Sequence, residues 1–137
     1  MTIAFQLAGQ DFIALNGGPI FKFNEAISLS VDCKTQQEVD ELWEKLSNGG
    51  QMGQCGWLKD QFGLSWQIVP SVLVEMLQDK NAEKYTRVME AIMQMTKIDI
   101  EQLQRAKRRN AQFIIGESYI AIVLVKRWAF IAPPRNQ

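Results

Sequence analysis

The sequence contains no histidine, only two cysteines, and no excess of charge of either sign. Lysine and arginine together number 15, and so do aspartate and glutamate. Without a histidine, a nucleophilic serine or cysteine would need another base to activate it, which disfavours nucleophilic catalysis. A net charge of zero provides no field that draws a protein to nucleic acid or to an anionic membrane, so we expect neither as a partner.

Disulfide frameworks, secretion signals and membrane spans are missing as well. Cys33 and Cys55 are too few for a framework, and free thiols are typical of a reducing compartment. Residues 1–7 lack the basic segment and the long apolar segment of a signal peptide. The most apolar run, residues 119–125, is far shorter than the roughly 20 residues that cross a bilayer. We therefore expect a soluble, cytoplasmic protein.

The sequence has enough apolar residues for one compact domain. It has 137 residues, of which 47% are hydrophobic, and this length suits a single core. Apolar and polar residues alternate in several short stretches, which is typical of strands with one buried face. Strands are predicted at residues 3–7, 11–15, 27–31, 55–58 and 64–69. The first two are joined by a tight turn, so they predict a hairpin.

Helical patterns begin after the third predicted strand. Thr35 and Glu38 form a capping box, and apolar residues follow at helical spacing as far as Leu46. Further helices are predicted at residues 72–77, at residues 82–95, and after Asp99, which can cap the last one. Residues 113–132 are rich in isoleucine and valine, and they predict either two strands or an unpaired, aggregation-prone segment. This order of elements indicates the α+β class.

Four stretches of the sequence carry a resemblance to a known family. They are residues 16–19 (NGGP), 21–26 (FKFNEA), 55–60 (CGWLKD) and 62–70 (FGLSWQIVP), and shorter matches extend to about residue 106. The chain resembles the PhnB-like family, whose members are often labelled 3-demethylubiquinone-9 3-methyltransferase-like. That family is part of the vicinal-oxygen-chelate (glyoxalase/bleomycin-resistance) superfamily. The resemblance implies paired βαβββ modules whose curved sheets enclose a pocket.

The resemblance also implies a domain organisation. Residues 26–70 look like the second βαβββ module, and the hairpin at residues 3–15 looks like the last two strands of the first. We therefore expect residues 1–106 to form a single incomplete vicinal-oxygen-chelate-like domain, truncated at its N-terminus. Residues 107–137 would be a C-terminal extension outside the resemblance. Unpaired sheet edges invite partner chains, so a homo-oligomer, most simply a dimer, is expected.

The cofactors of related proteins lack their usual residues in this chain. Metal-dependent members of the superfamily use His and Glu ligands, but the matching positions here are Ala26 and Gln67. Alanine has no ligating atom, and a neutral amide is a poor ligand for a catalytic divalent ion. A Rossmann-type S-adenosylmethionine site needs a glycine-rich turn between a strand and a helix, whereas Gly17 and Gly18 lead into Pro19. We therefore expect no metal and no cofactor.

A pocket is still expected on the predicted sheet. Trp57 and Trp66 lie on neighbouring strands and could wall a cavity, with amide groups supplied by Gln67 and Asn16. The alternative is that both tryptophans are ordinary core residues. Cys55 is a further candidate, either as a reactive thiol or, more in keeping with the missing histidine, as a buried structural residue.

Three functions are compatible with these features. The first is a metal-free, glyoxalase-like protein that binds a small organic molecule, with no activity assigned. The second is a truncated interaction or oligomerisation protein without catalysis. The third is the methyltransferase of the family label, which would require binding of S-adenosylmethionine.

Overall fold

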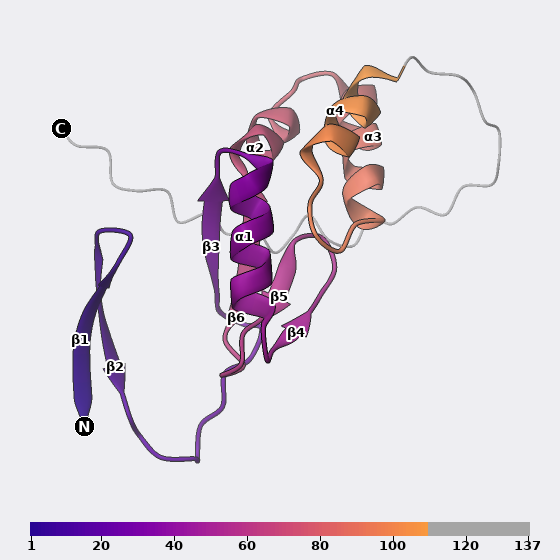
Figure 1. Ribbon diagram of the computed structural model, residues 1–137. Coiled ribbons are helices and arrows are strands. Elements are labelled where there is room, and N and C mark those ends of the chain that lie inside the picture. The colour runs from indigo at the N-terminus through magenta and orange to yellow at the C-terminus, as the bar shows by residue number, and fades with distance from the viewer. Residues whose placement is uncertain (110–137) are drawn as a thin grey trace.

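A computed structural model describes residues 1–109 of the chain, beginning with an antiparallel hairpin. Strand β1 (Thr2–Leu7) pairs with β2 (Gln10–Leu15) as predicted. Ala8 and Gly9 both have positive φ angles, of 49° and 78°, which is the backbone twist that two-residue hairpin turns need. Figure 1 shows the hairpin standing apart from the rest of the described chain.

The body of the fold is a four-stranded sheet with one long helix on it. Along the chain the elements are β3 (Ser28–Cys33), α1 (Gln36–Ser47), β4 (Gln51–Met52), β5 (Trp57–Lys59) and β6 (Ser65–Pro70). The strands lie in the order β3-β6-β5-β4. β3 and β6 are parallel, and the other pairs are antiparallel. This is the βαβββ arrangement that was predicted, with β4 as a short strand that the sequence pattern had not indicated.

Helix α1 begins with the N-terminal cap that the sequence predicts. The Thr35 side chain accepts a hydrogen bond from the Glu38 backbone N–H at 3.2 Å. The Glu38 carboxylate accepts a hydrogen bond from the backbone N–H of Lys34 at 2.6 Å. In the standard capping box the donor is one residue later, at the N-cap itself. Val39 and Trp43 then lie buried on the side of the helix that faces the sheet. They join a core with the strand residues Cys33, Leu58, Trp66 and Ile68.

Three helices follow the sheet and build a second core. They are α2 (Ser71–Leu77), α3 (Ala82–Met93) and α4 (Ile100–Arg108). Side chains of Asn81 and Asp99 cap α3 and α4, the second as predicted. The buried members of this core are Leu73, Met76, Val88, Ile92, Met95, Ile98 and Leu103. The α+β class is therefore confirmed.

The two cores meet just before β5. The backbone N–H groups of Cys55 and Gly56 donate to the carbonyls of Met95 and Thr96, both at 2.8 Å. These bonds tie the start of β5 to the loop between α3 and α4. Among residues 1–109, no helix is both long and apolar enough to cross a membrane. The strands predicted within residues 113–132 lie outside the described residues.

Candidate functional site

The sheet has two faces, and the strand register decides which side chains share each. Leu58 pairs with Trp66, and Trp57 pairs with Gln67. Directly opposed residues of an antiparallel pair point to the same face, and neighbours along a strand alternate. Because Leu58 and Trp66 belong to the core under α1, Trp57 and Gln67 lie on the other side. Ser65 pairs with Lys59 on that same side.

We call the side of the sheet away from α1 the distal face, defined by Ser28, Trp57, Lys59, Ser65 and Gln67. It carries a hollow of about 270 Å³ over β4 and β5. Trp57, Lys59 and Ser65 contribute to its lining, together with Glu25 from the segment that precedes β3 and the residues of β4. Its volume is slightly below that of typical small-molecule sites, which measure roughly 300–1,000 Å³.

Two polar atoms of the distal face are buried without a hydrogen-bond partner among the described residues. They are the Ser65 Oγ and the Gln67 Oε1. Ser65 is only 1% exposed. The Gln67 Nε2 donates to the Ser28 Oγ at 2.8 Å. If the side-chain amide were rotated by 180°, Oε1 would bond to Ser28 and Nε2 would be the atom without a partner. Roughly nine in ten buried polar groups in proteins have a hydrogen-bond partner. Two unpartnered polar atoms on one face therefore indicate a place where a polar partner can bind.

An ion pair lies at the edge of the hollow. The Lys59 Nζ contacts a carboxylate oxygen of Glu25, and both residues line the hollow. The hydrogen bond from Lys59 is the main reason that the pKa of the Glu25 carboxyl is lowered. Glu25 is therefore ionised at neutral pH and cancels the charge of Lys59. The hollow offers no unbalanced charge to a ligand.

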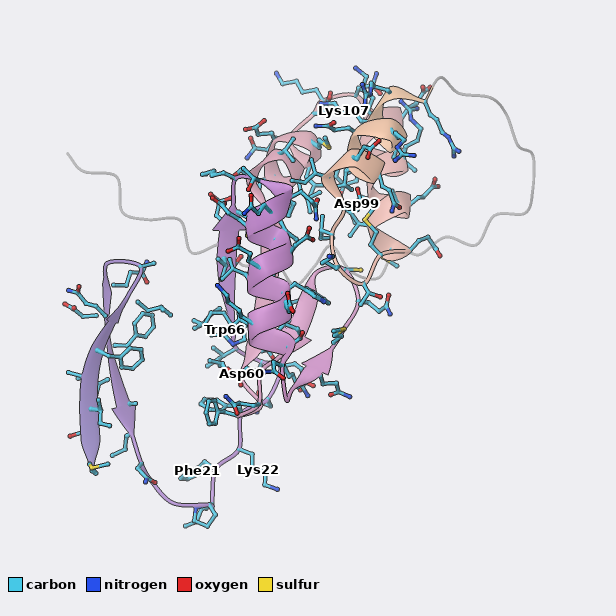
Figure 2. All side chains as sticks on the ribbon, viewed as in Figure 1. Phe21, Lys22, Asp60, Trp66, Asp99 and Lys107 are labelled. Carbon is cyan, nitrogen blue, oxygen red and sulfur yellow. The ribbon has the colours of Figure 1, made fainter. Side chains whose placement is uncertain are left out.

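Trp66 does not share this hollow with Trp57. It is 9% exposed and belongs to the core beneath α1. Its indole N–H donates to the Asp60 carboxylate at 3.0 Å, and that carboxylate also accepts from the backbone N–H groups of Phe62 and Leu64. Trp66 therefore holds the turn between β5 and β6 in place (Figure 2). Of the two predicted walls, only Trp57 faces the hollow.

Asn16 and Cys55 also lie away from the distal face. Asn16 is exposed at the end of the hairpin, and its side chain accepts from the Gly18 backbone N–H at 3.3 Å. Cys55 is half-buried against the helical core, and burial raises the pKa of its thiol. Burial also raises the pKa of Cys33, to about 11. Neither cysteine is activated as a nucleophile at neutral pH.

Of the five predicted site residues, the structure therefore brings only Trp57 and Gln67 together. Ser65 and Ser28 were not predicted as site residues. A signal for Ser65 existed, because Ser65 and Gln67 are two apart in a strand and must share a face. No sequence signal pointed to Ser28, since its contact with Gln67 depends on the parallel pairing of β3 with β6.

A second hollow, of about 340 Å³, lies beside α2 and α4. Met76, Gln104, Lys107 and Arg108 line it. Lys107 is already paired with Asp79 at 3.3 Å. Figure 2 places Lys107 at the opposite end of the body from Trp66. No buried unpartnered polar atom is found there among the described residues, so the hollow of the distal face is the better candidate site.

The residues present do not fit a divalent metal ion. Ala26 has no ligating atom, the Gln67 amide is uncharged and bonded to Ser28, and the nearby Glu25 carboxylate is held by Lys59. Hard divalent ions prefer several carboxylate or carbonyl oxygens. Within residues 1–109, no group of three or more Cys, Asp or Glu residues could hold a metal.

The described fold also does not fit a Rossmann-type S-adenosylmethionine site. Such a site needs a glycine-rich turn that leads from a strand into a helix. β3 enters α1 through Lys34 and Thr35, and β6 runs directly into α2. Gly17 and Gly18 lie in the segment between β2 and β3, so the element that follows them is a strand and not a helix. The methyl-transfer chemistry named in the family label has no support from these turns.

Comparisons with known proteins connect this arrangement to one family. The sequence model described as 3-demethylubiquinone-9 3-methyltransferase matches residues 1–69, from the hairpin to β6. A PhnB protein from Bacillus cereus, described as a candidate 3-demethylubiquinone-9 3-methyltransferase, is 31% identical over 52% of this chain, with a TM-score of 0.49. The chain covers 64% of that protein, and no curated protein matches. With half of its length matched, this chain belongs to the PhnB-like, 3-demethylubiquinone-9 3-methyltransferase family.

Proposed function

We propose that this protein binds a small, neutral organic molecule in the hollow of the distal face, without a metal ion. The observation that carries the proposal is the buried, unpartnered Ser65 Oγ, which belongs to a residue that lines the hollow; a second such atom, the Gln67 Oε1, lies on the same face of the sheet. Leaving such an atom unbonded costs about 1–3 kcal/mol. A ligand that bonds to one of them would recover part of that free energy, and this provides a driving force for binding.

The lining of the hollow suggests the chemistry of the ligand. Trp57 offers a flat apolar surface on which a planar group can pack. The Ser65 Oγ lines the hollow and can accept a hydrogen bond, and the Gln67 Oε1 on the same face accepts only. The neutral Glu25–Lys59 pair favours an uncharged ligand. At roughly 30 Å³ for each water-sized group, the hollow holds a molecule of about ten non-hydrogen atoms.

A reaction is not part of the proposal. The site has no histidine, no thiol with a lowered pKa and no fitting metal ligands. A general acid or base would have to come from the ligand or from Glu25, which is engaged with Lys59. The proposed compartment is the cytoplasm, in keeping with two free cysteines.

Thermal denaturation with small probes tests the proposal. The probes are benzamide, phenol and acetanilide, which are planar, neutral and carry one hydrogen-bond donor group. For ligands of this size a millimolar Kd is expected. At about ten times the Kd, binding would stabilise the fold by about 1.4 kcal/mol and raise the Tm by a few degrees. Benzoate is the matched anion and should stabilise less.

Two variants locate the binding. Ser65→Ala should abolish the ligand-induced shift and Gln67→Leu, next to the hollow on the same face, should reduce it, each measured against the variant's own Tm without ligand. Asn16→Ala is the matched control, because Asn16 is exposed and lies outside the hollow, and it should keep the full shift. The proposal is wrong if none of the three probes stabilises the wild-type protein. Stabilisation by S-adenosylmethionine, or by a micromolar divalent metal, would favour the methyltransferase or a metal site instead.

A further inference from the structure

Residues 16–27, which we call the strap, join the hairpin to the sheet with their side chains in solvent. Every residue of the strap is exposed. Its large apolar side chains are all more than half exposed, and they are Ile20, Phe21, Phe23 and Ile27. Figure 2 shows Phe21 and Lys22 standing clear of the sheet. The strap is therefore not held in place by the burial of apolar groups.

Among the described residues, one polar contact ties the strap to the rest of the fold. It is the ion pair between the Glu25 carboxylate and the Lys59 Nζ. Within residues 1–109, all other hydrogen bonds of residues 1–27 are made among those residues themselves. The Asn24 side chain accepts from the Ala26 backbone N–H at 2.9 Å, and this turn fixes the chain on both sides of Glu25. The position of the strap therefore depends on this ion pair.

The ion pair lies beside the buried Ser65 hydroxyl. Lys59 on β5 is directly opposite Ser65 on β6, so the two side chains are neighbours on the distal face. Glu25, Lys59 and Ser65 all line the same hollow, and yet the Ser65 Oγ is buried. A lysine side chain that lies across from Ser65 and is bound to the strap is in position to shield this hydroxyl from water.

An ion pair of this kind opens at little cost. The Lys59 and Glu25 side chains are 32% and 63% exposed, and pairs in contact with water favour the closed state by a factor of about five at most. Gly17 and Gly18, at the start of the strap, would have no neighbouring atom within 4 Å even if each carried a Cβ atom. This part of the chain therefore has room to move when the ion pair opens.

We infer that the Glu25–Lys59 ion pair is a latch, which holds the strap over the Ser65 hydroxyl and opens when a ligand bonds to this hydroxyl. The latch itself follows from the contacts of Glu25 and Lys59, whereas its role in ligand binding rests on the proposed function. A ligand has to offset the loss of the ion pair, so removal of the pair makes binding tighter. The latch thus sets the fraction of the protein that is ready to bind.

The reactivity of position 65 tests the latch without any ligand. Ser65→Cys places a thiol where the hydroxyl lies, and its alkylation by neutral iodoacetamide, located by mass spectrometry, reports how often this position is uncovered. The rate is extrapolated to the fully ionised thiol, so that a change in its pKa has no effect. Adding Glu25→Gln should speed the alkylation about two- to fivefold. Adding Glu41→Gln is the matched control and should leave the rate unchanged, because this carboxylate is paired with Lys45 on α1, away from the distal face.

Exchange of the two charges separates a latch from other effects of the variants. Glu25→Lys together with Lys59→Glu restores an ion pair in the reverse order and should return the alkylation to its slow rate. Salt should speed the alkylation while Glu25 and Lys59 are both present, because ions screen exposed pairs, and should have no effect after Glu25→Gln. Equal rates with and without Glu25→Gln would overturn the latch, and so would a fast rate in the exchanged pair.

Binding of benzamide tests the role of the latch in ligand binding, with Ser65 intact. Glu25→Gln should bind this probe up to about fivefold more tightly than the wild-type protein, and Glu41→Gln should bind it equally. Unchanged or weaker binding by Glu25→Gln would overturn this role. Faster alkylation without binding of any probe would support the latch and contradict the proposed function. Binding of the probes with unchanged alkylation would support the proposed function and overturn the latch.

Discussion

Two serines near the ends of β6 provide a paired test of the unpartnered polar atoms, because the same change to alanine should alter stability in opposite directions. The Ser65 hydroxyl is buried without a partner among the described residues. Its removal should relieve about 1–2 kcal/mol of desolvation cost. The space left by one oxygen atom, on the order of 10 Å³, should cost only about 0.3 kcal/mol. Ser65→Ala should therefore stabilise the free protein by about 1 kcal/mol.

Ser71→Ala is the matched control. The Ser71 Oγ donates to the Asp32 carboxylate at 2.6 Å and accepts from the Lys34 Nζ at 2.9 Å. Losing these bonds should destabilise the fold by about 1 kcal/mol. The free energies of unfolding of the two variants should thus differ by about 2 kcal/mol, although each variant loses one serine hydroxyl, from the first residue of β6 or from the residue that follows its end.

Urea denaturation followed by circular dichroism measures both variants, and thermal denaturation gives a second reading. For a domain of this size, 1 kcal/mol corresponds to a change in Tm of about 3–4 °C. A destabilised Ser65→Ala variant would refute the reasoning, because it would show that the hydroxyl already has a partner. The distal face would then have no unmet polar group at Ser65, and the proposed ligand site would lose its main support.

Two further predictions concern backbone strain and pH. Gly56 and Gly18 have similar φ angles, of 81° and 80°. A Cβ atom added at Gly56 would lie 2.8 Å from the Ile68 carbonyl oxygen, whereas a Cβ atom added at Gly18 would have no neighbouring atom within 4 Å. Gly18→Ala should cost only about 1–2 kcal/mol and Gly56→Ala clearly more, and equal Tm losses would contradict this. Burial raises the pKa of Cys33 from 9.0 to about 11, so the unfolded chain loses this proton first. The contribution of the protonated Cys33 thiol to the free energy of unfolding is present below pH 9 and is lost as the pH rises towards 11. Between these pH values, the free energy of unfolding should fall more steeply for the wild type than for Cys33→Ala. Parallel curves for the two proteins would exclude the effect.

Local features of the fold were predictable because their causes are local. The hairpin follows from alternation and a tight turn, and helix α1 follows from the capping box of Thr35 and Glu38. The resemblance to PhnB-like sequences predicted the βαβββ order. Strand β4 was missed because its two residues, Gln51 and Met52, are too few to show any period.

The candidate site was only half predictable. Trp66 and Gln67 are adjacent in one strand, so alternation by itself places them on opposite faces, and they could not have lined one pocket together. The sequence could not say which of them faces α1. That depends on the packing of Trp66 with Val39 and Trp43 beneath the helix.

The sequence by itself determined every described strand except β4, the helices, the family, and the lack of histidine and of metal ligands at Ala26 and Gln67. The tertiary structure alone decided that Trp57 shares the distal face with Gln67 and Ser65, and that Trp66 belongs to the core. The physical reason is register: residues that meet across strands are fixed by pairing between segments far apart in the chain. A period of two within one strand gives the alternation of side chains but not the neighbours that they meet.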